Sequence, residues 1–172
     1  MIRTTSVIML VVLLAVFLTS VVAAQSQVVV IHPFRDRGKV ITVYSDQVVV
    51  IRHGWAAASP GLVQSYINAV NQEYTLNGMP LFTSSKEARQ YWGPIQPLPD
   101  IPPEGACPGH TPISVSHWEY RLSNLQPGDY VLHTLHWVDR PLIDGCDSDG
   151  DGSMDHIRDW RIEGTLTIRV VQ

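Results

Sequence analysis

Leu125-Gln126-Pro127-Gly128-Asp129-Tyr130 decides the fold, because this turn-forming stretch separates two strand-like runs. Before it, apolar and polar residues alternate between positions 118 and 122, as they do in a strand with one buried face. After it, the run from Tyr130 to Val138 has the composition of a second strand. Leu166 to Val170 alternates in the same way and predicts a last strand, paired with the run that begins at Tyr130.

This stretch is similar to the corner between the fifth and sixth strands of immunoglobulin-like sandwiches. In those domains a tyrosine at the start of the sixth strand bonds back to the upstream backbone. The resemblance covers about 60 residues at the C-terminal end of the chain. It implies an immunoglobulin-like antiparallel β-sandwich in which Tyr130 is buried, with its hydroxyl bonded to the main chain.

The N-terminal half supplies further strands and one helix. Residues 27–31, 40–44 and 47–51 are β-branched runs separated by polar turn residues, which predicts three strands. Ser59-Pro60 is a helix start, and apolar residues then recur at helical spacing, which predicts one amphipathic helix over about 60–73. Asn77-Gly78 predicts a tight hairpin turn. We therefore expect a mainly β fold with one inserted helix, in a single domain over 25–172.

Composition excludes several classes of protein. The chain has 172 residues, of which 45% are hydrophobic, so it is expected to fold rather than to be disordered. Its net charge of -4 argues against a nucleic-acid partner, which would require a basic surface. Its two cysteines are too few for a disulfide-rich miniprotein or a four-thiolate zinc site.

Residues 1–24 have the pattern of a secretory signal peptide. Arg3 precedes an apolar run from Val7 to Leu18, and the small residues Ala23 and Ala24 suit cleavage after Ala24. We expect a secreted protein, extracellular or periplasmic, with no membrane insertion after cleavage. The alternative is an uncleaved N-terminal anchor, because Val7 to Ala24 is nearly apolar over 18 residues, which is at the short limit for crossing a bilayer.

In an oxidising compartment the two cysteines, Cys107 and Cys146, are expected to form a disulfide with each other. Cys107 lies in the segment 93–112, which carries seven of the twelve prolines and so cannot be a helix or a central strand. We expect this segment to be an ordered, extended strap along the domain.

The segment 144–159 contains the strongest motif. Asp147, Asp149, Asp151 and Asp155 stand at positions 1, 3, 5 and 9 of a loop, with glycine at position 6 and Ser153 at position 7. Calcium prefers hard oxygen ligands, and alternate residues of a tight loop can supply them. The loop resembles the calcium sites of EF-hand, dockerin and thrombospondin type 3 sequences, which implies a structural Ca²⁺ bound by these four aspartates and the Ser153 carbonyl.

The calcium loop departs from these families at position 12, where Arg158 replaces an acidic ligand. Asp159 or Asp144 is a candidate to complete the shell. Residues 139–159 hold seven acids and two arginines, so a net charge of -5 is concentrated in one connection. A cation there would relieve the repulsion; a solvated acidic turn without metal is the alternative.

No sequence motif points to a catalytic reaction. His133 and His136 lie three apart on an expected strand, so they face opposite sides and cannot share a metal. We therefore expect a non-catalytic module that binds an unknown protein or glycan ligand at the cell surface or outside the cell. The alternative is a small secreted hydrolase that uses a pair such as His136 and Asp139.

Overall fold

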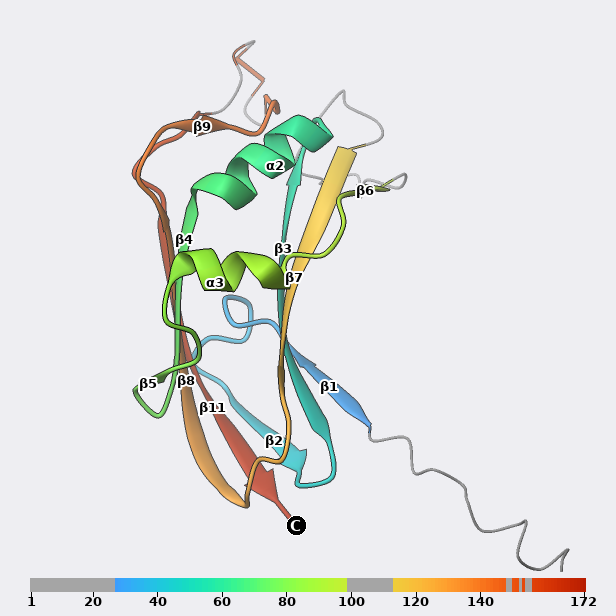
Figure 1. Cartoon of the computed structure of the whole chain (residues 1–172), viewed down its shortest axis with the longest axis vertical. Helices are drawn as coiled ribbons and strands as arrows, with labels where there is room; N and C mark the ends of the chain where they lie inside the picture. Colours follow the sequence, from blue (N-terminus) through green and yellow to red (C-terminus); the bar gives the residue numbers. More distant parts are fainter. Residues whose placement is uncertain (1–26, 99–112, 148–149, 152, 154–155) are drawn as a thin grey trace, which may run out of the picture.

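A computed structural model gives the fold and describes residues 27–98, 113–147, 150–151, 153 and 156–172 (Figure 1). The longer strands are β3 (Val48–Ala57), β4 (Val70–Leu76), β7 (Ile113–Leu122), β8 (Gly128–Val138) and β11 (Arg161–Val171). The shorter strands are β1 (Val28–Ile31), β2 (Val40–Tyr44), β5 (Met79–Pro80), β6 (Gln96–Leu98), β9 (Leu142–Ile143) and β10 (His156–Ile157). The helices are α2 (Pro60–Ala69), α3 (Ser85–Ala88) and the single 3₁₀ turn η1 (Arg89–Tyr91). Within these ranges, no helix has the length and apolar character needed to cross a bilayer.

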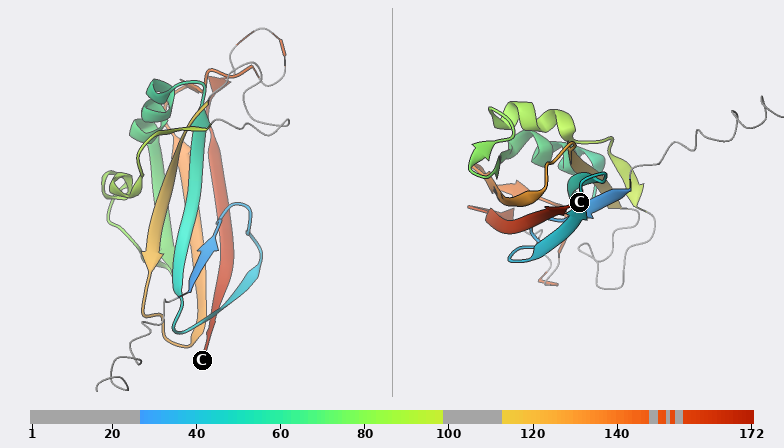
Figure 2. Two further views of the ribbon diagram at one scale, coloured as in Figure 1. Left: turned by 90° about the vertical axis from the view of Figure 1, so that its right-hand side faces the viewer. Right: turned by 90° about the horizontal axis from the view of Figure 1, so that it is seen from below.

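Two sheets pack face to face, which confirms the expected mainly β sandwich (Figures 1 and 2). One sheet has the strand order β1-β3-β7-β6, and the other has the order β2-β11-β8-β4-β5. Buried side chains from both sheets fill the space between them, and they include Ile51 and Trp118 from the first sheet and Leu132 and Ile168 from the second. The pair β9-β10 stands apart from both sheets and brings together the two ends of the acidic segment.

The long central pairs are antiparallel, as expected, but two edge pairs are parallel. β1 runs parallel to β3, and β2 runs parallel to β11. The reason is that β1 and β2 belong to different sheets, so the connection between them crosses from one sheet to the other. Asp36 fixes this crossing by accepting hydrogen bonds from the His32 backbone N–H at 2.9 Å and from Lys39 Nζ at 2.8 Å.

The inserted helix is confirmed, although it ends earlier than expected. Ser59 caps its N-terminus and Pro60 occupies the first turn. The helix stops at Ala69, whereas the sequence predicted an end near position 73. Residues 70–76 form β4 instead, because pairing with β8 outweighs the helical spacing of the apolar residues. The spacing is ambiguous there, since a repeat of four residues fits one face of a helix and also one face of a strand.

Two predicted turns are confirmed. Asn77 and Gly78 have φ values of 51° and 77° and join β4 to β5, as a two-residue hairpin turn requires. At the corner before β8, the Tyr130 hydroxyl donates to the Gln126 carbonyl at 2.9 Å. Tyr130 itself is half-buried rather than buried, so that part of the expectation was wrong. Its ring packs at the rim of the core, where solvent still reaches it.

Helix α3 was not expected from the sequence. Ser84 caps it, and the Glu87 carboxylate accepts from the Thr83 N–H and hydroxyl, both at 2.7 Å. Figure 1 shows that α2 and α3 both cross from the side of β4 to the side of β7. The buried indole of Trp118 donates to the Ala88 carbonyl at 2.7 Å, so α3 is fixed to β7. The chain that follows α3 is therefore held close to the edge of the first sheet.

Candidate functional site

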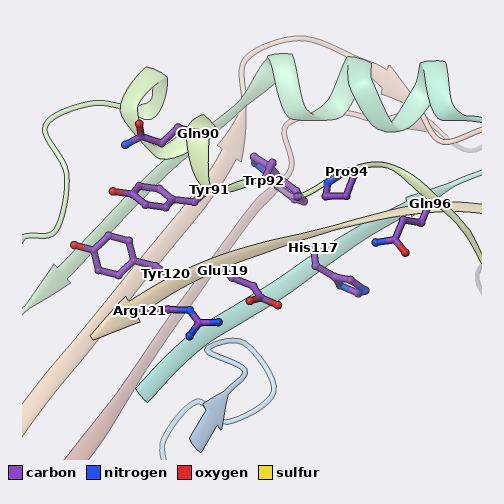
Figure 3. Close-up of a pocket in the computed structure, with 10 residues that line it drawn as sticks. Gln90, Tyr91, Trp92, Pro94, Gln96, His117, Glu119, Tyr120 and Arg121 are labelled. Carbon is purple, nitrogen blue, oxygen red and sulfur yellow. The ribbon is translucent and has the colours of Figure 1, made fainter. Parts of the chain in front are cut away.

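A groove of about 700 Å³ runs along one edge of β7 (Figure 3). One wall comes from β7 and the other from the chain between η1 and β6. Ten residues line it: Gln90, Tyr91, Trp92, Gly93, Pro94, Gln96, His117, Glu119, Tyr120 and Arg121. The volume lies within the range of small-molecule pockets, roughly 300–1,000 Å³.

The groove lies at the edge of β7, so side chains from both faces of the strand border it: His117, Glu119 and Arg121 from one face and Tyr120 from the other. Trp118 and Leu122 are buried between the sheets, whereas His117 and Arg121 are exposed on the outer face. β7 pairs with β3 along nearly its whole length, from Ser114 to Leu122. The groove therefore lies beside a rigid central strand, and its charged side chains have a fixed spacing.

The second wall follows β7 closely and then leaves it. Trp92 bridges Trp118, the Gly93 N–H donates to the His117 carbonyl at 2.8 Å, and the Ser116 hydroxyl donates to the Gly93 carbonyl at 2.8 Å. The preceding residues form η1 rather than continuing as a strand. The groove opens where η1 departs from β7.

Aromatic rings line the inner side of the groove, and charged groups line its outer side. Tyr91 and Tyr120 meet edge to face, with ring centroids 4.9 Å apart. Partial burial, together with Tyr91 and Glu87, raises the pKa of Tyr120, so the phenol is neutral. Glu119 pairs with Arg52 of β3 at 2.6 Å. β7 also carries Arg121. None of the ion pairs among the described residues involves it.

This combination suits binding. Tyr, Trp and Arg are the residues most enriched where proteins bind other proteins. The groove could not be predicted from the sequence, because its two walls, residues 90–96 and 117–121, are about 20 residues apart in the chain. Only the alternation from position 118 to 122 hinted at one exposed face of β7.

A second cluster is buried between the sheets. The Gln72 amide nitrogen lies 3.1 Å from His53 Nε2 and 3.2 Å from His136 Nε2, and the Tyr74 hydroxyl lies 2.8 Å from His136 Nε2. Aromatic rings enclose the two imidazoles, with Trp118 stacked on His53 and the Phe34 ring 4.8 Å from His136. The cluster joins β3 of one sheet to β4 and β8 of the other.

Burial keeps both imidazoles of this cluster neutral. Desolvation lowers the pKa of His136 to about 3. Desolvation also lowers the pKa of His53 well below its usual range, and the nearby His136 and His117 add to this effect. An amide nitrogen has two hydrogens to donate, so Gln72 can serve both rings only while each Nε2 is unprotonated. The cluster therefore links the two sheets by hydrogen bonds that require both imidazoles to be neutral.

The candidate hydrolase pair His136 and Asp139 is not built as a catalytic dyad. His136 is buried against Tyr74 and Gln72, whereas Asp139 is exposed and accepts from Asn71 Nδ2 at 2.6 Å. The expectation that His133 and His136 face opposite sides is confirmed. His133 Nε2 contacts Glu163 Oε1 at 2.8 Å on the outer face of the second sheet.

The acidic loop is described only in part. Asp147 Oδ1 accepts from the backbone N–H groups of Gly150 and Asp151 at 2.8 and 3.1 Å, and Asp151 Oδ1 accepts from Ser153 N–H at 2.7 Å. The other two predicted ligands, Asp149 and Asp155, lie outside the described residues. In the described part of the chain, no three His, Cys, Asp or Glu side chains are placed to hold a metal. The calcium site stays a prediction.

Three further predictions concern residues that are only partly described. Cys146 is buried beside Ile113, but Cys107 lies outside the described residues, so the disulfide stays a prediction. The part of the strap that is described, residues 93–98, contains the edge strand β6 (Gln96–Leu98), in keeping with its prolines. The signal peptide at 1–24 also lies outside the described residues.

Comparison with known proteins assigns no family. No family model matches the chain, and no curated protein matches it. Among solved structures, the fold is similar to that of the cysteine protease inhibitor EhICP2 from Entamoeba histolytica, with 7% sequence identity and a TM-score of 0.39. The match covers 86% of this chain and 98% of that one. A likeness at this level carries no argument about what the chain does.

Proposed function

We propose that this chain is an exported, non-catalytic β-sandwich module that binds a protein or glycan ligand outside the cell through the β7 groove. The observation that carries the proposal is the groove itself, with two tyrosines on one side and Arg121 on the other. Export by the signal peptide 1–24, the Cys107–Cys146 disulfide and a structural Ca²⁺ in the loop 144–159 belong to the same proposal.

The groove favours a binding role for two physical reasons. Tyrosine rings give a large contact area at a small loss of side-chain entropy, and Arg offers several hydrogen-bond donors in a fixed geometry. Both walls are already ordered by hydrogen bonds to the sheet, so a ligand would not have to order them. The hydrolase alternative has less support, because His136 is buried on β8, whereas the groove lies along β7 of the other sheet and His136 does not line it.

The exported protein can be screened on peptide and glycan arrays to test this function. Tyr91→Ala should weaken every genuine binder by about tenfold, which corresponds to the loss of one interface aromatic. Met79→Ala is the matched control, because Met79 is 73% exposed on the β4–β5 hairpin and does not line the groove. A ligand that binds both variants as well as it binds the unmodified protein would show that the groove is not the binding site.

A further inference from the structure

The β7 strand has a partner on one side along its length and only a partial partner on the other. On the groove side, β6 pairs with residues 113–115, and Trp92 bridges Trp118. Because Trp92 lies opposite Trp118, the next residue, Tyr91, takes the position opposite Glu119. Beyond that position, in the described ranges, no strand pairs with Tyr120–Leu122 on that side. A strand edge of this kind presents unpaired N–H and C=O groups that can template another strand.

The direction of these backbone groups follows from a neighbouring bond. The His117 carbonyl points into the groove, where it accepts from the Gly93 N–H. In a strand, the N–H and C=O of every second residue point to the same side. The main-chain groups of Glu119 and Arg121 therefore face the groove, whereas those of Tyr120 face β3.

The protein already uses this pairing mode on the same edge. The chain from Trp92 to Leu98 runs antiparallel to β7, whereas the preceding residues form η1 and do not continue along the strand. A second polypeptide segment could continue the antiparallel pairing from that point. The groove beside that point gives the segment room for its side chains.

We propose that the ligand of this groove is an extended polypeptide that adds to the free edge of β7, antiparallel to Tyr120–Leu122. Directly opposed residues of two strands share a face of the sheet. Glu119 is paired with Arg52 and does not neutralise Arg121. The ligand residue opposite Arg121 should therefore be acidic. The residue opposite Tyr120 should be apolar, because it meets the Tyr91 and Tyr120 rings.

This inference rests on the proposed function and narrows its ligand to one chemical class. A glycan could stack on Tyr91 and Tyr120, but it would not need the alternating donors and acceptors of Glu119 and Arg121. A second copy of this chain could pair through the same edge, and it would reveal itself as a dimer. Both are distinct outcomes of the test.

The test uses the capped peptide Thr-Val-Asp-Leu, whose Asp falls opposite Arg121 and whose C-terminal Leu falls opposite Tyr120, so that the peptide ends before the position taken by Trp92. Its first control is the same peptide with an N-methyl group on Asp, the residue whose N–H would face β7. Its second control carries Lys in place of Asp. Binding to the full exported protein is measured by calorimetry. We expect the unmodified peptide to bind at least tenfold more tightly than either control.

Two protein variants separate backbone pairing from side-chain contact. Arg121→Ala keeps the groove-facing N–H, and Arg121→Pro removes it without affecting a bond to β3. We expect the proline variant to bind the peptide about tenfold more weakly than the alanine variant. Circular dichroism and melting show whether each variant folds. If the proline variant does not fold, the N-methylated peptide on the unmodified protein still decides.

The inference is overturned if the N-methylated peptide binds as well as the unmodified one, if the two Arg121 variants bind alike, or if the protein forms a β7-dependent dimer that excludes the peptide. An array ligand that needs Tyr91 but is indifferent to Arg121→Pro would overturn strand addition and leave the proposed function standing. If a bound ligand depends neither on Tyr91 nor on the Arg121 N–H, both strand addition and the proposed function are overturned.

Discussion

The Tyr130 hydroxyl closes the corner before β8 through one hydrogen bond to the Gln126 carbonyl. Tyr130→Phe removes that bond and leaves the ring, so the free energy of unfolding should fall by about 0.5–1.5 kcal/mol. Denaturant unfolding measures this loss. Tyr44→Phe is the control, because Tyr44 is 55% exposed on β2, and it should change nothing. If Tyr130→Phe is as stable as Tyr44→Phe, the hydrogen bond at the corner does not stabilise the fold.

Because the imidazoles are buried, the free energy of unfolding should fall in mild acid. Burial lowers the folded pKa of His136 to about 3, whereas an unfolded histidine titrates near its model value of 6.5. Between these values the unfolded chain binds a proton that the folded chain refuses, so stability falls as the pH falls below 6.5. His136 should contribute a slope of about 1.4 kcal/mol per pH unit. His53 adds to the slope in the same direction.

The slope is best measured by urea unfolding between pH 6.5 and pH 5. The carboxylates with lowered pKa values are Asp36, Glu87, Asp129 and Glu163, and they lose their contribution only as the pH falls below their model values of 3.8 and 4.5. His136→Gln should reduce the slope, and His133→Gln, on the outer face, is the matched control. A slope that His136→Gln leaves unchanged would contradict the buried cluster.

Among the elements, β11 and the crossing from β1 to β2 meet at Gly164. A Cβ on Gly164 would lie 2.7 Å from the Pro33 carbonyl oxygen, which is backbone and cannot swing away. Gly164→Ala should therefore destabilise the fold by about 1–3 kcal/mol. Gly61→Ala is the control, because Gly61 lies in α2 and a Cβ there would have Ser59 Oγ as its nearest atom, at 4.0 Å. It should be neutral or stabilising by up to about 1 kcal/mol. Thermal unfolding of both variants tests this contrast.

Elements encoded by local signals were predictable from the sequence. The Asn77-Gly78 turn, the Ser59 cap and the alternation after Tyr130 each depend on neighbouring residues. β4 was mistaken for helix because Val70 and Tyr74 fit both periods, and only pairing with β8 decides between them. The parallel edge pairs depend on a sheet crossing that no local pattern encodes.

The candidate site was harder to predict for the same reason. Its groove needs η1 and β7 side by side, and the buried cluster needs His53, Gln72 and His136 from three strands of two sheets. In sequence these residues are isolated polar positions within strand-like or helix-like runs. Their convergence is a property of the packed sandwich.

For the whole molecule, the proposed calcium loop is held between the paired strands β9 and β10. A ligand that binds only the folded state at ten times its Kd adds roughly 1.4 kcal/mol of stability, which raises the melting temperature by a few degrees. Millimolar calcium should produce this shift, and magnesium should not. Asp151→Ala should abolish the shift. Calorimetry without binding heat or a melting shift would mean that the segment is a solvated acidic turn.

The central claim is that the β7 groove is the binding face of this module. The most direct measurement maps backbone amide shifts by nuclear magnetic resonance as the Thr-Val-Asp-Leu peptide or an array ligand is added. We predict changes confined to residues 90–93 and 117–121, with slowed hydrogen exchange at the Arg121 amide. Changes centred elsewhere, with residues 117–121 unaffected by a bound ligand, would contradict the claim.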